Sequence, residues 1–351
     1  MTSRRVAIAV AILATAPPVG RWSAAQAPPT RWILAYPGTL KGGIGTSYTV
    51  DDFVRLLGVV DSTGRVTSWL CSGMILLQLY APSGRVFTTW AGGIPATGTD
   101  WTEYLDSIAG PQGALQRLDS AVAVVAAAAG DLGSKYPVSL MVPYPDPKVD
   151  SVSFQGVTYS VGTPDGRAAA VGSYVRAGAA LFARTGFRNL RLDGFYWLAE
   201  NVSARDTATV TRSAAEVHRA HVRFLWIPYY FALGQERWRQ LGFDEAWLQP
   251  NFFFDPKVPL DRLDSAAAHA GRLDLGVEVE FNAKMFTDPP RFAGRLDPYL
   301  DMLMASPALR HRSIAVYDGQ GALVRLSRST VPGERALYSR LVHALTTRDS
   351  R

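Results

Sequence analysis

The sequence NLRLDGFYW at residues 189–197 begins the most regular part of the chain. It is an apolar run of strand length, and similar runs follow at residues 222–230 (VRFLWIPYY), 245–253 (EAWLQPNFF) and 274–282 (DLGVEVEFN). Each run precedes a segment with helical spacing of its apolar residues, at 206–220, 234–241, 260–270 and 290–304. This alternation predicts strands four to seven of a sheet in which helices connect parallel strands.

The same alternation continues on both sides of this part. Residues 31–36 (RWILAY), 74–80 (MILLQLY) and 138–144 (VSLMVPY) predict strands one to three, and residues 312–318 (RSIAVYD) predict strand eight. Helices are predicted at 49–60, with Thr49 as the cap, at 100–132 with a break near 110–113, at 164–185, and from strand eight to Leu345. The alternating SVSFQGVTYSV in loop 145–163 predicts a small inserted hairpin.

Eight strand–helix units within one domain length favour a single α/β domain, a (β/α)8 TIM barrel with a long loop insertion after strand three. The alternative is an open, doubly wound α/β sheet. No GxGxxG or GxxxxGK[ST] pattern supports nucleotide binding.

Residues 1–27 have the layout of a secretory signal peptide. Arg4 and Arg5 precede an apolar run at 6–16, and AQA at 25–27 is a small-x-small cleavage site. The apolar run is about half the ~20 residues needed to cross a bilayer. We therefore expect a periplasmic or secreted protein in which residues 28–351 form the barrel domain, without stable membrane insertion. The two arginines also permit twin-arginine export, and an uncleaved anchor is the alternative.

Charge and cysteine content argue against a nucleic-acid-binding protein and against a protein stabilised by disulfides. Removing the three arginines of the leader leaves 33 basic against 30 acidic side chains, with no block of five or more Lys or Arg. This balance does not indicate a nucleic-acid partner. Cys71 is the single cysteine, so no intramolecular disulfide can form and stability must come from a core.

In a (β/α)8 barrel the active site lies at the C-terminal ends of the strands. The residues predicted there are polar and aromatic, and Tyr and Trp combine a flat apolar face with a polar edge that suits sugar rings. Each aromatic residue alone could equally be barrel packing. We expect substrate contacts from Tyr36, Tyr144, Asp193, Tyr196, Trp197, Tyr229, Tyr230, Gln249, Asn251, Glu278, Asn282 and Asp318.

Strand seven carries two acids on one face. Period-two alternation places Glu278, Glu280 and Asn282 together, and Gln249 and Asn251 share a face of strand six, so amides should lie beside the acids. Two glutamates on a buried strand are costly unless they are paired, hydrogen-bonded or used. One of them could instead be a structural partner of a barrel arginine.

Cleavage of a glycosidic bond requires two carboxyl groups that flank it. We predict Glu200, just past strand four, as the general acid, and Glu280, near the exit of strand seven, as the nucleophile or base. In many retaining barrel glycosidases the two acids follow strands four and seven and an Asn follows the acid, as Asn201 does here; this is an analogy at fold level.

Both Glu200 and Asp193 also have structural alternatives. Glu200 could be a solvated loop carboxylate, and Asp193 a barrel carboxylate bonded to Tyr230 or Arg191. The residues that other reaction types need are missing. None of the five histidines is placed as a metal ligand. A Schiff-base lysine would lie inside a strand, whereas Lys284 follows strand seven. No Gly-x-Ser-x-Gly occurs. We expect neither a metal nor an organic cofactor.

LRLDGFYWLAEN (190–201), YYFALGQERWRQLGFDEAWLQPNFFF (229–254) and VEVEFN (277–282) together resemble the bacterial DUF4855 family. This is a domain of unknown function grouped with glycoside-hydrolase-like barrels, and the resemblance covers most of the chain after the leader. Its motifs are fairly specific together and weak singly. The resemblance implies a carbohydrate-active barrel, with Glu200, Glu278 and Glu280 at the acidic positions of the pattern.

The function expected is therefore an exported glycoside hydrolase that acts on an oligo- or polysaccharide, with a retaining mechanism favoured. The runner-up is a catalytically silent carbohydrate-binding barrel in which the acids are structural. A polysaccharide lyase or glycosyl transfer enzyme would use the same pocket with Tyr229 or Tyr230 as the base.

Overall fold

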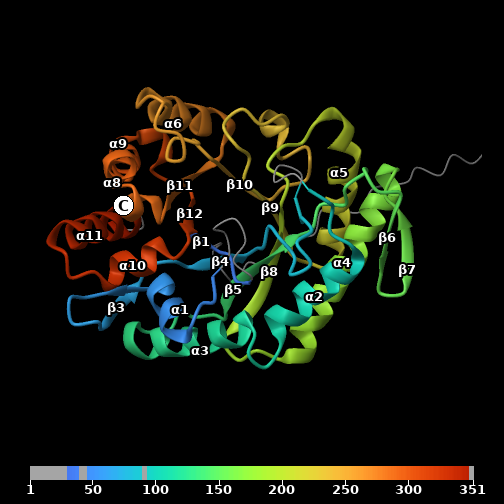
Figure 1. The fold of residues 1–351 in the computed structure, drawn as a ribbon, viewed down its shortest axis with the longest axis horizontal. Coiled ribbons are helices and arrows are strands. Elements are labelled where there is room, and N and C mark those ends of the chain that lie inside the picture. Colours follow the sequence, from blue (N-terminus) through green and yellow to red (C-terminus); the bar gives the residue numbers. More distant parts are fainter. Residues whose placement is uncertain (1–29, 39–45, 89–92, 348–351) are drawn as a thin grey trace, which may run out of the picture.

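The computed structural model describes residues 30–38, 46–88 and 93–347, and its centre is a closed barrel of eight parallel strands (Figure 1). The strand order around the barrel is β1-β12-β11-β10-β9-β8-β5-β4. Because β1 pairs with both β12 and β4, the barrel sheet has no free edge. The barrel strands are β1 (Arg31–Ala35), β4 (Gly73–Leu76), β5 (Tyr136–Val142), β8 (Leu190–Trp197), β9 (Arg223–Trp226), β10 (Glu245–Leu248), β11 (Gly276–Asn282) and β12 (Ile314–Gly319).

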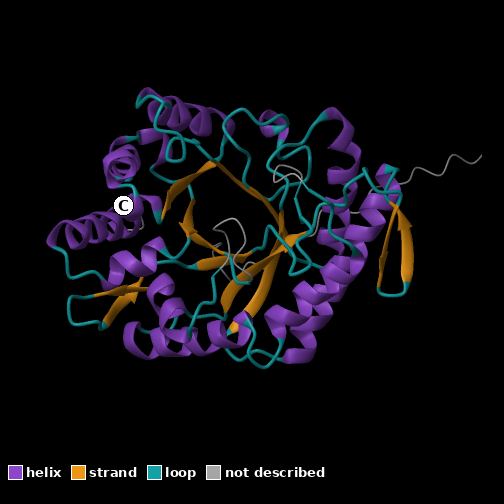
Figure 2. Ribbon diagram, in the orientation of Figure 1, coloured by secondary structure: helices purple, strands orange, loops and turns teal. Residues whose placement is uncertain are grey.

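Helices surround the barrel (Figure 2), which confirms the predicted (β/α)8 fold. The α-helices are α1 (Val50–Leu57), α2 (Gly98–Ala109), α3 (Ala114–Ala129), α4 (Pro164–Thr185), α5 (Ala204–Arg219), α6 (Asp261–Leu273), α7 (Lys284–Thr287), α8 (Pro289–Phe292), α9 (Asp297–Ala305), α10 (Ala322–Arg328) and α11 (Pro332–Thr346). Within the described residues, short 3₁₀ turns are η1 (Gln235–Arg237), η2 (Ala293–Arg295) and η3 (Pro307–Leu309).

Local sequence explains where helices begin and end. Thr49 caps α1 as predicted: its side chain accepts a hydrogen bond from the Asp52 backbone N–H, and the Asp52 side chain accepts one from the Thr49 N–H. Helix α1 ends at Leu57, earlier than predicted, because residues 58–60 pair as strand β2 (Gly58–Val60) with β3 (Val66–Trp69). The predicted break near 110–113 separates α2 from α3.

Two predicted helices are shorter or divided. The segment 234–241 contains only the turn η1, because it packs as a loop in which buried Trp238 donates its indole N–H to the Leu273 carbonyl. The segment 290–304 is divided into α8, η2 and α9. Pro289 and Pro290 fit only the first turn of a helix, and Gly294 weakens the turn that follows.

A small hairpin, β6 (Ser151–Phe154) and β7 (Val157–Ser160), lies between β5 and α4 and projects from one side of the barrel (Figure 1). Its turn is Gln155-Gly156, and both residues have positive φ, at 53° and 75°. Positive φ at both central positions is the geometry that joins two twisted antiparallel strands with the shortest loop.

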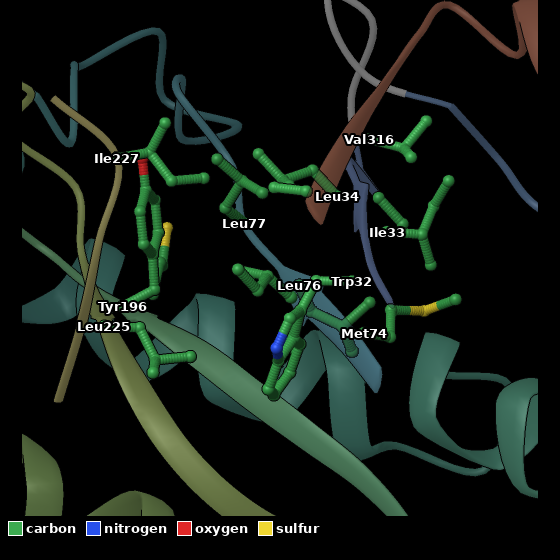
Figure 3. Close-up of a cluster of buried hydrophobic side chains, with 14 of the residues drawn as sticks. Trp32, Ile33, Leu34, Met74, Leu76, Leu77, Tyr196, Leu225, Ile227 and Val316 are labelled. Atoms are coloured by element: carbon green, nitrogen blue, oxygen red, sulfur yellow. The ribbon is translucent and has the colours of Figure 1, made fainter. Parts of the chain in front are cut away.

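The barrel interior is filled by apolar side chains, as Figure 3 shows for one part of it. The register of the parallel ladders places alternate residues of neighbouring strands on the same side. Side chains that point inward include Trp32, Leu34, Leu77, Tyr196, Leu225 and Ile227, whereas Ile33, Met74 and Val316 point toward the helices.

Two tryptophans fill the lower end of the barrel, which is the end where the strands begin. Trp32 and Trp247 are fully buried and meet edge to face, with ring centroids 5.8 Å apart. A Cβ added to Gly73 would lie 2.8 Å from the Trp32 ring, and one added to Gly276 would lie 2.4 Å from the Trp247 ring. These two glycines therefore make room for the indole rings, and the space that remains open is at the other end of the barrel.

The predicted leader, residues 1–27, and the boundary that follows it lie outside the described residues. Within the described ranges, none of the helices has the length and apolar character needed to span a membrane.

Candidate active site

A cavity of about 370 Å³ lies at the C-terminal ends of the barrel strands. Small-molecule sites typically have volumes of roughly 300–1,000 Å³. The lining side chains come from the ends of the strands and from the loops that follow them. They are Leu34, Tyr36, Leu77, Leu79, Tyr196, Leu198, Glu200, Gln249, Asn251, Phe254, Glu278, Asn282, Lys284, Tyr317 and Gln320.

Several of the residues selected from sequence meet in this cavity. They come from four different strand ends, and the inward face of β11 supplies two of them, as period-two alternation predicts. The predicted residues that line the cavity are Tyr36, Tyr196, Glu200, Gln249, Asn251, Glu278 and Asn282.

Glu200 and Glu278 converge on the side chain of Gln249. The amide nitrogen of Gln249 donates a hydrogen bond to Glu200 Oε1 at 3.2 Å, and the same side chain hydrogen-bonds Glu278. Glu200 lies in the loop just after β8, whereas Glu278 lies within β11. An acid that follows the fourth barrel strand and an acid on the seventh therefore share one amide group.

Asn251 orients that amide. Its Nδ2 donates to Gln249 Oε1 at 3.0 Å, and its Oδ1 accepts the backbone N–H of Tyr230 at 2.8 Å. Because the oxygen of Gln249 is already engaged, its NH2 group must face the two carboxyls. Asn251 has a left-handed backbone, with φ of 51°, which costs on the order of 1 kcal/mol for a residue other than glycine. This local strain accompanies a residue that positions the site.

Burial raises the pKa of the carboxyls in the upper barrel. The pKa of Glu200 rises to about 7 because of burial, and the hydrogen bond from Gln249 opposes this rise. The pKa of Glu278 rises well above its ordinary value because of burial and then because of the negative charges of Glu280 and Glu200. Such close groups cannot all ionise near neutral pH, so the cluster retains a proton there.

Glu280 is fully buried and does not line the cavity. Its Oε2 accepts a 2.5 Å hydrogen bond from the hydroxyl of Tyr299, which belongs to α9 outside the barrel. Tyr299 can reach it because the β10–β11 ladder ends early, at the pair Leu248 and Val277. Burial raises the pKa of Glu280 to about 7, and the Tyr299 hydroxyl opposes this rise. Glu280, which we predicted would face the substrate, is thus hydrogen-bonded to Tyr299 within the protein instead.

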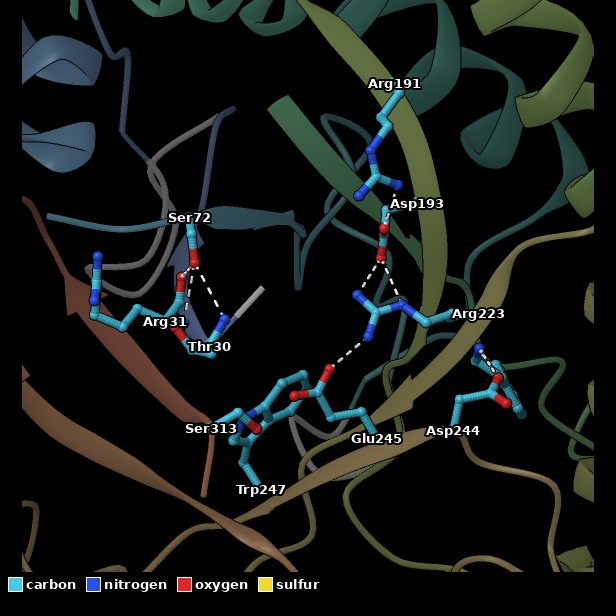
Figure 4. A network of polar contacts seen from close by, with 11 residues as sticks. Thr30, Arg31, Ser72, Arg191, Asp193, Arg223, Asp244, Glu245, Trp247 and Ser313 are labelled. Carbon is cyan, nitrogen blue, oxygen red and sulfur yellow. Dashed lines mark hydrogen bonds and ion pairs between the residues drawn. The ribbon is translucent and has the colours of Figure 1, made fainter. Parts of the chain in front are cut away.

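Asp193 lies at the opposite end of the barrel, in a β-bulge where the register with β5 shifts. Arg191 donates to it at 2.5 Å, and Arg223 donates to it through Nε at 2.8 Å (Figure 4). Arg223 also bonds Glu245 at 2.8 Å, so the network joins the starts of β8, β9 and β10. Asp193 therefore lies outside the cavity. It is bonded to Arg191, as the alternative structural role given for it in the sequence analysis predicted.

Three other predicted contacts lie outside the cavity: Trp197 and Asp318 point outward because each neighbours an inward-pointing tyrosine on its strand, and Tyr144 lies two residues past the end of β5. Trp197 is fully buried, with Tyr144 packed edge to face at 5.9 Å. Tyr144 donates to Asp206 in α5 at 2.9 Å. Asp318 is fully buried, and its carboxylate accepts the backbone N–H of Leu323 at 2.9 Å. None of these three predicted contacts lines the cavity.

Tyr229 and Tyr230 lie at the rim without lining the cavity. Tyr229 forms a parallel bridge with Gln249 just beyond β9. The ring of Tyr230 packs on the guanidinium of Arg262, at 4.2 Å. Their role in the site is to hold Gln249 and Asn251 through the backbone.

The cavity also contains residues that were not selected from sequence. Tyr317 pairs with Glu280 in the β11–β12 ladder and forms edge-to-face contacts with Tyr36 at 5.3 Å and Phe254 at 5.6 Å. The alternation of inward and outward side chains along strand eight would have predicted Tyr317 as a cavity residue in place of its neighbour Asp318. Gln320 and Phe254 lie in turns and Lys284 begins the four-residue helix α7, and hydrophobic periodicity gives no signal for such short segments.

Two other features carry less chemistry. In the part of the chain that the structure describes, no three His, Cys, Asp or Glu side chains are grouped to hold a metal ion. A larger hollow of about 590 Å³ is lined by residues of α1, α10 and the turns beside them, shares no residue with the cavity inside the barrel, and contains Arg328, which is ion-paired with Asp51 and Asp52. The cavity at the strand ends is therefore the candidate site.

Residues 32–343 match the family model described as "Domain of unknown function (DUF4855)". Among solved structures, the chain is similar to a mutant tryptophan synthase alpha-subunit from the hyperthermophile Pyrococcus furiosus, with 11% identity, coverage of 90% of this chain and 96% of that chain, and a TM-score of 0.40. A tryptophan synthase complex from the same organism gives 11% identity, coverage of 91% and 98%, and a TM-score of 0.39. No curated protein matches the sequence.

Proposed function

Because this chain belongs to the DUF4855 family, a domain of unknown function, we propose its activity from the cavity: it is a glycoside hydrolase in which Glu200 and Glu278 flank the scissile bond. Glu278 takes the role that we predicted for Glu280 from its place near the exit of strand seven, because Glu278 lines the cavity whereas Glu280 is bonded to Tyr299.

One observation carries the proposal: two carboxyls from different strand ends meet at one amide inside a cavity walled by tyrosines. Two oxygens that accept hydrogen bonds from the same NH2 group lie roughly 5 Å apart. Carboxyl separations of about 5 to 5.5 Å are typical of retaining glycosidases, in which no water has to fit between the second carboxyl and the sugar. An amide shared by both carboxyls fits a separation of this order, and we therefore propose the retaining mechanism.

The raised pKa of Glu200 supports its role as the proton donor. A pKa of about 7 allows Glu200 to hold a proton near neutral pH and to donate it to the oxygen of the leaving sugar. Glu278, whose pKa is also raised, must first lose its own proton to solvent; it then attacks the anomeric carbon as the carboxylate, and Gln249 donates a hydrogen bond to it. In the second step Glu200 removes a proton from water, which attacks the anomeric carbon and releases Glu278.

The walls of the cavity suit a sugar. Burial raises the pKa of Tyr36 and Tyr196 well above 10, so both phenols stay neutral and can donate hydrogen bonds to hydroxyl groups. Tyr317 and Phe254 add aromatic surface for the apolar face of a ring. The amides of Asn251 and Asn282 provide further donors and acceptors.

The alternatives receive less support. A silent binding barrel would be favoured by a Glu200 that pointed away from the cavity, whereas Glu200 lines it. A lyase would need a tyrosine base, but Tyr229 and Tyr230 do not line the cavity, and the phenols that do have raised pKa values. Export forms part of the proposal through the leader pattern at residues 1–27, and a mature protein that begins at Pro28, measured by mass spectrometry, would support it.

The proposal is tested with purified wild type, Glu200→Gln and Glu278→Gln on a panel of aryl glycosides and bacterial polysaccharides. We expect the wild type to hydrolyse at least one substrate and both variants to lose activity by about a hundredfold or more. Glu236→Gln is the matched control, because Glu236 is an exposed glutamate in the loop after β9. Equal activity in all four proteins would remove the mechanism.

Sodium azide separates the two roles on an activated aryl glycoside. Added to Glu278→Ala, azide should occupy the space of the missing nucleophile and give a glycosyl azide of inverted configuration. Added to Glu200→Ala, it should attack the glycosyl–enzyme intermediate and give the retained configuration. The opposite pair of products would exchange the roles of Glu200 and Glu278.

A further inference from the structure

Lys284 is the one basic side chain among the described residues that line the cavity. It follows β11 at the start of α7, and its backbone N–H donates to Asn282 Oδ1 at 2.9 Å, which fixes the turn from the strand into the mouth of the cavity. Lys284 is exposed, whereas Glu278 below it on the same strand is buried. The cavity therefore has acids at its base and one cation at its mouth.

The charge of Lys284 is not neutralised by the fold. Its Nζ lies 5.2 Å from the ring centre of Phe292, and no carboxylate in the described ranges pairs with it. Asp288, one helical turn further on, is paired with Arg291 at 2.6 Å instead. Asp349 is the sole acidic residue outside the described ranges. An aromatic face holds an ammonium group in place while leaving N–H donors for a ligand.

Gln320 lines the same mouth from the turn after β12. Asn282 and Gly319 are paired in the β11–β12 ladder, so the residues that follow each of them, Lys284 and Gln320, emerge from neighbouring strands. Gln320 has a left-handed backbone with φ of 61°. Glycine would adopt this conformation without strain, so the position carries a polar side chain at a conformational cost.

We propose that Lys284 and Gln320 form a subsite for an anionic substituent, so that the substrate is an acidic glycan that carries singly charged groups, either the carboxylate of a uronic acid or a sulfate ester. This inference rests on the proposed function, because it places the charged group next to the bond that Glu200 and Glu278 flank. An ammonium and an amide supply point-like donors that match one carboxylate or sulfate.

The acids of the cavity do not exclude such a ligand. Burial and mutual repulsion raise the pKa values of Glu200 and Glu278, so the base of the cavity is not fully ionised near neutral pH. A singly charged group at the mouth lies nearer to Lys284 than to these acids. A neutral sugar would leave the Lys284 charge without a partner.

The test measures binding to Glu200→Gln, which cannot turn the ligand over, by calorimetry at low salt. The probes are oligogalacturonates, glucuronic-acid-containing oligosaccharides and sulfated oligosaccharides, each beside a neutral counterpart made by carboxyl reduction or desulfation. We expect one acidic probe to bind about tenfold or more tightly than its neutral counterpart, and Lys284→Met in the same background to abolish that difference. The control is Lys257→Met, because Lys257 is an exposed lysine that does not line the cavity.

Each outcome bears on one proposal. The inference is overturned if no acidic probe binds, if acidic and neutral probes bind equally, or if Lys284→Met and Lys257→Met behave alike. Which probe binds separates a carboxylate from a sulfate. If an acidic glycan binds through Lys284 but the wild type cleaves nothing, the hydrolase proposal fails and the subsite remains. If the wild type cleaves neutral glycans independently of Lys284, the hydrolase remains and the subsite is lost.

Discussion

Glu200→Gln should make the protein more stable at alkaline pH while removing its activity. The substitution keeps the size of the side chain and an oxygen that can accept the hydrogen bond from Gln249. In the wild type, burial moves the pKa of this carboxyl from 4.5 in its ordinary surroundings to about 7 in the fold. The folded protein thus binds a proton more tightly at Glu200 than the unfolded chain does.

The sign of the pH dependence follows from this difference. Between about pH 4.5 and pH 7 the folded state holds more protons than the unfolded state, so the free energy of unfolding falls as the pH rises. Above pH 7 the full difference is lost, which amounts to roughly 3 kcal/mol. Removing the charge of Glu200 also relieves the repulsion that it exerts on Glu278 and Glu280.

Urea unfolding, followed by tryptophan fluorescence, measures the effect at pH 4 and pH 8.5. Glu200→Gln and wild type should be equally stable at pH 4, where both side chains are neutral. At pH 8.5 the variant should be more stable by up to about 3 kcal/mol, or roughly 4–5 °C in Tm. A variant no more stable than wild type at pH 8.5, or stabilised equally at both pH values, would refute the claim that burial of the Glu200 charge costs stability.

Three other substitutions probe the barrel. Arg223→Met removes the cation that Asp193 and Glu245 share and leaves Asp193 with Arg191 alone, so we expect it to lower the free energy of unfolding by about 3 kcal/mol in urea; an unchanged midpoint would mean that the network contributes nothing. Tyr299→Phe removes the hydroxyl that donates to Glu280, which raises the pKa of that carboxyl further. Its loss of about 1–3 kcal/mol should be larger at pH 8.5 than at pH 5, and an equal loss would contradict this assignment. Asn251→Ala and Asn251→Gly both free the Gln249 amide to rotate, so both should lower kcat/KM about tenfold on the substrate found in the screen; activity restored by glycine would point to backbone strain alone.

The order of apolar runs was enough to predict the barrel, because a strand of period two and a helix of period 3.6 leave different marks on a sequence. Alternation also predicted which residues of β11 face inward, and it placed Gln249 and Asn251 on one face. Since a (β/α)8 barrel has its site at the strand ends, these local signals were sufficient to bring Glu200, Glu278 and Gln249 to one cavity.

Only the tertiary structure decided how far along the barrel axis each side chain lies and which groups it contacts. Asp193 faces Arg223 at the lower end because a bulge shifts the register of β8, and register between strands depends on contacts far apart in the sequence. Glu280 lies on the same face of β11 as Glu278, yet its carboxyl accepts a hydrogen bond from Tyr299 of α9. The Tyr299 side chain reaches it where the pairing of β10 with β11 ends. A sequence records the alternation along one strand, whereas the relative shift of two strands, and what passes between them, is set only when the barrel closes.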